Sequence, residues 1–315
     1  KLEIDRLAKM ISVGTDIQAS HLAQSVTINL VSKIDTCINS PEFVERNLAS
    51  RLAECGVLPM YGMPTRVRDL YYELPFNGRK ESPKTISRDV DLAITDFQPG
   101  AERTKYKQTL KVNGLIGPIS YDQVANRWVA DDAIKYRRWH GFCQSCMHLE
   151  ETEDLAQIHT TCIDCGDEII PFEVVAPAGF RTDGRPVDGP EDDNYGASGR
   201  AFIAASTTPS KGVQQKYEKN TELELQVQGR VFRINDNNGN QFGLQEVQDA
   251  ALSNLPVHGT HLIKPVSQDD CTDTLSLVSP KITNLLIFQP ASVASGLTID
   301  PRRFGAGVKA AYYSA

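Results

Sequence analysis

Apolar residues in the first part of the chain recur at three- and four-residue steps, which is the pattern of amphipathic helices. The clearest series within residues 1–38 comprises Leu22, Val26, Leu30, Ile34 and Cys37. Ser40 followed by Pro41 is typical of a helix cap and first turn, and the apolar residues after it predict a further helix that ends near Gly56. We therefore expect residues 1–75 to form a helical segment.

The middle of the chain mixes helical and strand-like periods. A short helical stripe within residues 86–100 consists of Val90, Ala93, Ile94 and Phe97. Residues 102–121 alternate as strands do, around a turn expected at Asn113 and Gly114. We expect residues 76–135 to form a mixed α/β connector.

Alternation with a period of two dominates the last third of the chain. Leu223, Leu225 and Val227 alternate with polar residues, and residues 235–240 read NDNNGN, a strong turn signal between strands. A second group indicates another hairpin and comprises Leu275, Leu277, Leu285 and Ile287. We expect residues 200–315 to be a β-rich domain with a final helix from near Pro301. The overall prediction is an α+β fold.

Four of the seven cysteines form a cluster in the sequence. Cys143, Cys146, Cys162 and Cys165 follow the spacing C-x2-C-x15-C-x2-C. Two such turns each direct two thiolates at one ion, which predicts a structural zinc site within a lobe over residues 136–182. Gly166 would relax the second turn where backbone amides approach sulfur. Two disulfides or four unrelated thiols are the alternatives, and an iron–sulfur cluster is a further metal alternative.

Other residues near the cluster do not change this prediction. His140, His148 and His159 could replace a ligand, but four cysteines already complete the set. Cys37, Cys55 and Cys271 lie in apolar stretches, so we expect small, unpaired core residues there. We therefore expect a closed zinc site that organises its lobe and has no hydrolytic role.

The composition is that of an ordinary globular protein, with 315 residues, 40% hydrophobic and 23% charged. No apolar run is long enough to cross a membrane, and the start does not resemble a signal peptide. We expect a cytoplasmic protein with no membrane partner. The chain begins without Met, so we also expect a piece of a longer polypeptide.

Motifs for nucleotide hydrolysis and for common hydrolases are missing. The sequence contains no G-x-x-x-x-G-K-[ST], G-x-G-x-x-G, H-E-x-x-H or G-x-S-x-G pattern. Asp89, Asp91 and Asp96 could suggest a metal-dependent nuclease, but residues two apart on a helix do not share a face. A better explanation for these aspartates is that they place negative charge at the start of a helix and form ion pairs with Arg88. No catalytic residue is predicted within this chain.

The net charge of -7 is unevenly distributed along the sequence. Residues 66–149 hold 14 basic and 10 acidic residues, whereas residues 150–195 hold 2 basic and 13 acidic residues. The Asp-, Gly- and Pro-rich stretch 183–199 predicts a mobile acidic loop. A nucleic-acid partner is therefore not excluded, but it would contact residues 66–140 and avoid residues 150–195.

Basic and aromatic residues interleave in two places within that basic part. One set comprises Tyr61, Arg66, Arg68, Tyr71 and Tyr72, and the other runs from Lys135 through Arg137, Arg138 and Trp139 to His140. Guanidinium groups bind phosphates and aromatic faces stack on unpaired bases. A solvated face with extended basic side chains is the alternative. The predicted nucleic-acid contacts are Arg66, Arg68, Arg137, Arg138 and Trp139.

Several segments resemble the C-terminal region of superfamily 2 DNA helicases, in particular MrfA-type repair helicases and the large helicases of the antiphage systems Druantia and DISARM. The resemblance covers residues 45–315, with the paired C-x-x-C as its most specific part. The segments are LAECGVLPMYGMPTRVRDLYYEL (52–74), ISRDVDLAITDFQPGAE (86–102), FEVVAPAGFRTD (172–183), GRVFRINDNNG (229–239), DCTDTLSL (270–277) and the closing GVKAAYYSA.

The resemblance implies a zinc-binding accessory region of an ATP-dependent DNA helicase, acting in antiphage defence and guiding single-stranded DNA. ATP and Mg²⁺ would bind motor domains of the same polypeptide, outside this chain. A partner subunit of a defence system is also implied. The alternative is a zinc-shaped scaffold for such a subunit, with the acidic loop as a contact.

Overall fold

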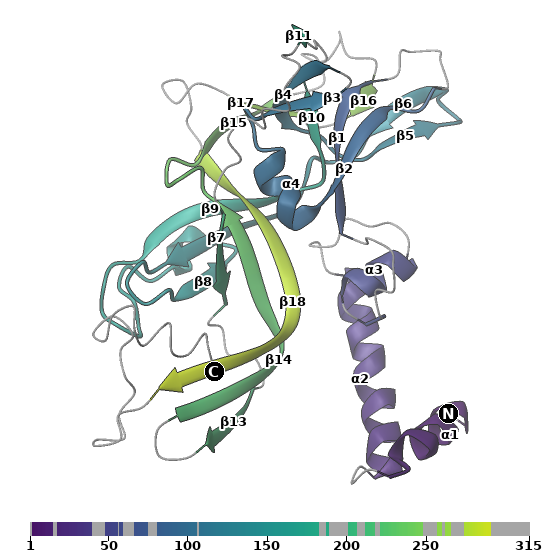
Figure 1. The fold of residues 1–315 in the computed structure, drawn as a ribbon, viewed down its shortest axis with the longest axis vertical. Helices are drawn as coiled ribbons and strands as arrows, with labels where there is room; N and C mark the ends of the chain where they lie inside the picture. The colour runs from purple at the N-terminus through teal and green to yellow at the C-terminus, as the bar shows by residue number, and fades with distance from the viewer. Residues whose placement is uncertain are drawn as a thin grey trace. The chain divides into compact units, whose positions relative to one another are not determined.

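The protein, seen here in a computed structural model, has a mixed α+β fold in which strands predominate (Figure 1). Contacts divide the chain into two units, Lys1–Arg66 and Val67–Ala315. The structure describes residues 2–14, 18–39, 48–55, 57–58, 66–74, 81–105, 107–182, 187–188, 201–206, 212–217, 221–247, 257–259, 262–265 and 274–290. Several predicted features lie outside these residues, namely the Ser40–Pro41 cap, Tyr61, most of the acidic loop, Cys271 and the final helix.

The first unit is helical, as the sequence predicts. It contains α1 (Leu2–Ser12), α2 (Ala19–Asn39) and α3 (Leu48–Glu54). None of the helices in the described part of the chain is long and apolar enough to cross a membrane.

Two cysteines of this unit correct an expectation from the sequence. Cys37, near the end of α2, and Cys55, just after α3, are both buried, and they form a disulfide instead of being unpaired core residues. The Arg51 guanidinium Nε also donates a hydrogen bond of 2.7 Å to the Cys37 carbonyl oxygen. The two helices are therefore joined by a covalent and a polar link, which their apolar surroundings in the sequence did not indicate.

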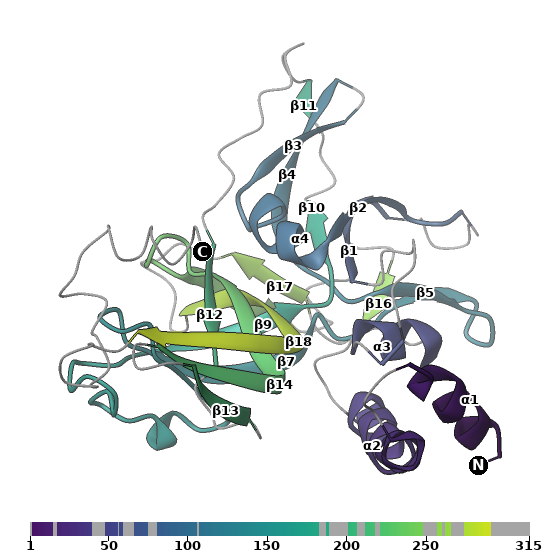
Figure 2. The same cartoon turned by 60° about the horizontal axis from the view of Figure 1, so that its bottom comes forward.

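The second unit is built on one strongly curved, mixed sheet (Figures 1 and 2). Its central path runs β2-β1-β10-β4-β17-β15-β18-β9-β7-β8, while β5, β6 and β16 form a separate three-stranded sheet. The strands before the cysteine cluster are β1 (Val67–Glu73), β2 (Lys84–Asp89), β3 (Glu102–Lys105), β4 (Gln108–Leu115), β5 (Ile119–Asp122), β6 (Arg127–Ala130) and β7 (Ile134–Phe142). Helix α4 (Val90–Asp96) follows β2, and Asp89 caps it by accepting from the Asp91 amide.

The remaining strands complete this sheet, except for β16, which belongs to the three-stranded sheet. They are β8 (Leu149–Thr152), β9 (Ile170–Pro177), β10 (Phe180–Thr182), β11 (Val187–Asp188), β12 (Phe202–Ala205), β13 (Gly212–Tyr217), β14 (Thr221–Asn235), β15 (Phe242–Val247), β16 (Val257–Gly259), β17 (Leu262–Pro265) and β18 (Thr274–Pro290). The short 3-10 turn η1 (Leu155–Gln157) lies between β8 and β9. The long strands β14 and β18 pair antiparallel and bend together (Figure 1).

Strands β9 and β18 separate two hydrophobic cores. They pair in parallel, with Leu277 opposite Val175. Val175 and Leu277 face one core together with α4, whereas Val174 and Val278 face the other together with β7 and β14. A strand buried on both faces has a nearly continuous apolar sequence, which explains why residues 172–180 do not alternate.

The structure corrects several sequence boundaries. Asn113 and Gly114 lie within β4, and the turn falls between β3 and β4 instead. Residues 274–290 form one strand and not a hairpin, because each half pairs with β14. Strand β1 belongs to the sheet unit and not to the helical segment expected over residues 1–75. The parts expected over 136–182 and 200–315 likewise share one sheet, since β9 pairs with β18.

Candidate metal centre

Four cysteine thiols converge between β7 and β9. Cys143 and Cys146 lie in the turn after β7, and Cys162 and Cys165 lie in the turn before β9. The Sγ atoms of Cys143 and Cys165 are 3.4 Å apart, as are those of Cys146 and Cys162. All four sulfur atoms lie within 4.8 Å of one another. The structure therefore brings the whole predicted ligand set together.

The two cysteine turns have the same backbone hydrogen bonds. In the first turn the Cys143 amide donates to the His148 carbonyl and the Met147 amide donates to the Cys143 carbonyl, each at 2.9 Å. In the second turn the Cys162 amide donates to the Asp167 carbonyl at 2.7 Å, and the Gly166 amide donates to the Cys162 carbonyl at 2.8 Å. Each bond of one turn recurs 19 residues later, so two copies of one knuckle face each other.

Backbone amides hydrogen-bond to the sulfur atoms and oppose the effect of burial, which disfavours thiolates. Burial would raise the pKa of the Cys143 thiol, but hydrogen bonds from the Cys146 amide, the Cys165 thiol and the Ser145 amide together lower it to about 7. Burial raises the pKa of the Cys146 thiol, although the His148 amide opposes that shift. Such amide groups stabilise the negative charge that thiolate ligands bring to a cation.

The sulfur geometry fits a metal ion better than disulfides. Sulfur atoms bound to zinc at about 2.3 Å in a tetrahedron lie about 3.8 Å apart, and the four thiols here span a similar range. Disulfide sulfurs lie about 2.05 Å apart, and all four cysteines are free. The cluster could therefore hold a metal ion such as zinc, in a closed site with four protein ligands.

A small apolar core supports the cluster from the side of β7. Ile158 and Ile169 pack with Cys143 and Cys162. Gly141 on β7 makes this packing possible, since a Cβ atom there would lie 2.6 Å from a methyl carbon of Ile158 and 2.8 Å from one of Ile169. The close approach of the loop to the strand therefore depends on Gly141, which belongs to no turn or motif signal in the sequence.

Histidines and carboxylates form an open chain of polar contacts beside the four thiols. His148 Nδ1 lies 2.6 Å from the Asp164 carboxylate, which joins the first knuckle to the second. The Glu150 carboxylate lies 3.4 Å from His148 Nε2 and 2.9 Å from His159 Nδ1. His148 and His159 therefore both contact carboxylates. Asp164 lies between Cys162 and Cys165, where the C-x-x-C motif accepts any residue, so its contact with His148 was not predicted.

His140 lies apart from the thiols, within the core between β7 and β14. Its ring contacts Phe172 and Phe232 edge-on, with ring centroids 6.0 and 4.7 Å away. Its Nε2 lies 3.5 Å from the Tyr136 hydroxyl oxygen, and its Nδ1 has no hydrogen-bond partner among the described residues. His140 is therefore a core residue and not a substitute metal ligand.

The structure gives Arg66 and Arg68 places inside the protein. Both side chains are buried, and the Arg68 guanidinium donates to the Pro177 carbonyl at 2.9 Å and to the Val67 carbonyl at 3.0 Å. Arg68 thereby ties β1 to the end of β9. Contact of Arg66 and Arg68 with nucleic acid stays a prediction, and the structure supplies a packing role for Arg68.

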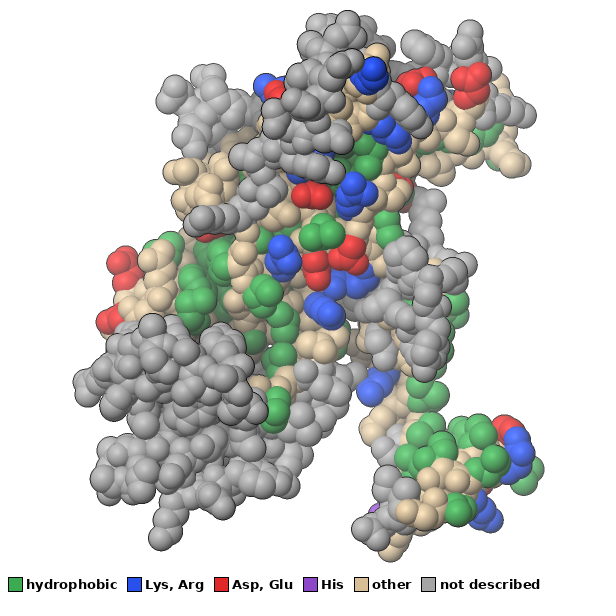
Figure 3. All heavy atoms as spheres, viewed as in Figure 1, with side chains coloured by type: hydrophobic (Ala, Val, Ile, Leu, Met, Phe, Trp, Pro, Cys, Tyr) green, Lys and Arg blue, Asp and Glu red, His purple; other side chains and the backbone are tan. Residues whose placement is uncertain are grey.

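The second predicted set divides between the two faces of β7. Arg137 and Trp139 project to one face, and Arg138 projects to the other with Tyr136. The Arg137 guanidinium pairs with Glu173 at 2.5 Å, and Arg138 pairs with Glu153 at 2.7 Å. On the face in Figure 3, basic and acidic side chains intermingle and form no continuous basic stripe among the described residues. The three residues are therefore not one patch.

The three aspartates considered for a nuclease have structural partners. Asp89 caps α4, Asp91 accepts a hydrogen bond of 2.5 Å from the Ser279 hydroxyl, and Asp96 pairs with Arg103 at 3.3 Å. Arg88 also lies 3.8 Å from Asp96, as the sequence analysis expected. They are not among the groups of described residues placed to hold a metal ion.

Comparisons with known proteins do not assign the chain to a family. No protein-family model, curated protein or solved structure matches it.

Proposed function

We propose that this chain is a zinc-stabilised accessory region of an ATP-dependent DNA helicase or translocase, acting in bacterial antiphage defence and guiding single-stranded DNA. The observation that carries the proposal is the convergence of four thiols on two matching knuckles. A closed four-thiolate zinc site fixes a fold and leaves chemistry to other domains. The resemblance of several segments to superfamily 2 helicases supplies the DNA partner.

The strand that leads into the first knuckle supports a nucleic-acid role. Arg137 keeps 52% of its side chain exposed although it pairs with Glu173. Trp139 is only half-buried on the same face of β7. A guanidinium beside an indole offers a phosphate contact and a stacking surface.

DNA binding by the purified chain tests this proposal. We expect fluorescence anisotropy to detect binding of a labelled single-stranded oligonucleotide that weakens as salt rises, and Trp139→Leu to weaken it at every salt concentration. Val124→Leu, at an exposed position in the β5–β6 turn, is a matched surface control. DNA binding that does not weaken with salt and is unchanged by Trp139→Leu would contradict the proposed contact.

A scaffold for a partner subunit is the second candidate, and the ion pairs of β7 favour it. Arg137 and Arg138 both have carboxylate partners, which compete with phosphate for the guanidinium groups. In this alternative, zinc only shapes a docking surface. Co-purification of the partner with the chain from which residues 183–199 are deleted distinguishes the two: loss of the partner supports the scaffold, and retention counts against the acidic loop as its contact.

A further inference from the structure

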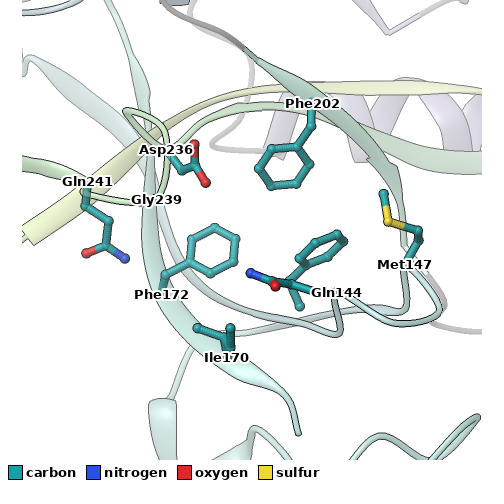
Figure 4. Close-up of a pocket in the computed structure, with 9 residues that line it drawn as sticks. Gln144, Met147, Ile170, Phe172, Phe202, Asp236, Gly239 and Gln241 are labelled. Carbon is teal, nitrogen blue, oxygen red and sulfur yellow. The ribbon is translucent and has the colours of Figure 1, made fainter. Parts of the chain in front are cut away.

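A pocket of about 440 Å³ opens beside the first cysteine knuckle. Its walls come from segments far apart in the sequence: the ends of β7 and β9, the knuckle itself, β12, and the turn between β14 and β15. Figure 4 shows the rings of Phe172 and Phe202 and the carboxylate of Asp236 around one central space. Sites for small ligands typically measure about 300–1,000 Å³, so this pocket has the size of a ligand site.

The apolar walls of the pocket suit a flat ligand. The rings of Phe142 and Phe202 lie 5.1 Å apart between centroids with an interplanar angle of 36°. Because these two rings contact each other, they form one wall and do not enclose a ligand from two sides. Phe172 and Ile170 border the same space. A planar aromatic ligand can stack on such a wall, whereas a round ammonium group requires rings on several sides.

The polar groups of the pocket select a ligand with N–H donors. The Asp236 carboxylate only accepts hydrogen bonds, and the lining contains no Lys or Arg among the described residues. The exposed Gln144 side chain, whose amide both donates and accepts, reaches toward the same space (Figure 4). Gln241 is partly used, since its Oε1 accepts from the Thr274 hydroxyl. A phosphate group would find no cation among these residues, so any negatively charged group of the ligand must remain outside the pocket.

The turn that carries Asp236 is held in a fixed conformation. Both the Gly239 and the Gln241 amides donate to the Asp236 carbonyl, at 3.1 and 2.8 Å. Asn237, Asn238 and Gln241 all have left-handed backbones, with φ of 54°, 56° and 56°. Asn235 anchors the turn to α4 by donating to the Ile94 carbonyl at 2.7 Å. A fixed acceptor lowers the entropic cost of binding.

We propose that this pocket binds an unstacked guanine base of single-stranded nucleic acid. Guanine presents two adjacent N–H donors, N1–H and the 2-amino group, to one carboxylate, and its O6 can accept from the Gln144 amide. Its flat ring stacks on the Phe wall, and its sugar and phosphate stay in solvent. The inference deepens the proposed function and rests on it for the nucleic-acid partner.

Oligonucleotides that differ at one base test the pocket. We expect the full zinc-loaded chain to bind oligothymidine with one central guanine about tenfold more tightly than the same strand with hypoxanthine, which lacks the 2-amino group, or with adenine. Asp236→Asn should abolish this preference and leave the affinity for plain oligothymidine unchanged. Asp122→Asn, which keeps the turn cap of the β5–β6 hairpin, is the matched control and should retain the preference.

Two further measurements separate the pocket from the proposed function. Saturation-transfer NMR with free guanosine should show contact with the wild type and none with Asp236→Asn; if Asp236→Asn lowers the melting temperature, Gln144→Ala replaces it and should weaken guanosine binding. If guanosine binds and no oligonucleotide does, the pocket stands and the proposed DNA role fails. Oligonucleotide binding without a guanine preference would overturn the proposal that the pocket binds guanine, and would leave the DNA role intact. Preferential binding of a trimethyl-lysine peptide over guanosine would also overturn that proposal.

Discussion

Met147 and Gly166 occupy the same position of the two knuckles, and both have left-handed backbones, with φ of 66° and 78°. Each follows the second cysteine of its C-x-x-C turn, where the chain must reverse for amides to face sulfur. Glycine adopts this conformation without steric cost, whereas methionine does not. The first knuckle therefore contains backbone strain that the second avoids.

Exchanging the residues at these positions should change stability in opposite directions. Gly166→Ala should destabilise the zinc-loaded protein by about 1 kcal/mol, because a Cβ in this conformation is strained even though open space surrounds it. Met147→Gly should be neutral or stabilising by up to about 1 kcal/mol. Urea unfolding of both variants measures these changes in the free energy of unfolding. If Met147→Gly destabilises the protein as much as Gly166→Ala does, Met147 is not strained and the two positions are not equivalent.

Removal of one thiol should empty the metal site. We expect roughly one zinc ion per wild-type chain and almost none in Cys143→Ser, since hydroxyl is a poor substitute for thiolate in a four-thiolate site. Metal analysis of the purified proteins measures this. Cys37→Ser, which removes a cysteine of the first unit, is the matched control and should keep its zinc. Equal zinc in wild type and Cys143→Ser would be hard to reconcile with the assigned ligands.

Crowding at Gly141 leads to a second test of the same lobe. Gly141→Ala should cost about 1–3 kcal/mol, because its Cβ would overlap methyl groups of Ile158 and Ile169. The loop bearing the second knuckle would have to move away from β7, so zinc should also be released more readily to a chelator. The double variant Gly141→Ala with Ile158→Leu, whose Cβ is unbranched and therefore lacks the clashing Cγ2 methyl group, should recover part of the loss.

The sequence predicts those features of the candidate metal site that depend on short-range spacing. The C-x-x-C pairs predicted the four cysteines that could bind a metal ion and, through Gly166, one turn conformation, because these depend on neighbours a few residues apart. The position of Met147 was not predicted, since methionine is not a residue that signals a left-handed backbone. Asp164 and Gly141 were missed for a related reason: each acts through a partner that only the fold brings close.

Strand boundaries were harder to predict than element types. Helix α4 and the turn before β15 matched their local signals, which were the apolar stripe within residues 86–100 and the NDNNGN stretch. Leu275 and Leu285 were assigned to separate arms of a hairpin, because alternation cannot show whether a long strand continues through Pro280. In the structure β14 pairs with residues on both sides of Pro280, from Leu277 to Pro290. The pairing of Cys37 with Cys55 was likewise a long-range contact that the spacing did not reveal.

The ion pair of Arg137 with Glu173 affects how any DNA-binding variant is interpreted. Glu173 is buried, so Arg137→Ala would leave a buried carboxylate without its partner and should destabilise the protein by about 1–3 kcal/mol. Arg137→Ala combined with Glu173→Gln should recover much of that stability, since no buried charge remains. Thermal unfolding of both variants measures the difference. Weakened DNA binding by the single variant but not the double variant would then report folding and not a phosphate contact.

The buried imidazole of His140 should make stability depend on pH. Burial, reinforced by the nearby Arg230, lowers the pKa of His140 from 6.5 to about 3. Between these values the unfolded chain binds a proton that the folded chain excludes, so the free energy of unfolding falls as pH falls below about 6.5. Each pH unit in this window costs up to about 1.4 kcal/mol from this group alone.

Replacing His140 with phenylalanine should remove that part of the pH dependence. The ring would remain between Phe172 and Phe232, and the Tyr136 hydroxyl would keep its 2.5 Å hydrogen bond to Glu151. Urea unfolding from pH 7 to pH 4 should therefore show a shallower loss of stability in His140→Phe than in wild type, with similar values near pH 7.5. The carboxylates and thiols that titrate in this range are common to both proteins, so the difference between the two curves belongs to His140. Parallel curves would show that the folded protein accommodates a charged imidazole at this position, and they would contradict the low pKa of His140.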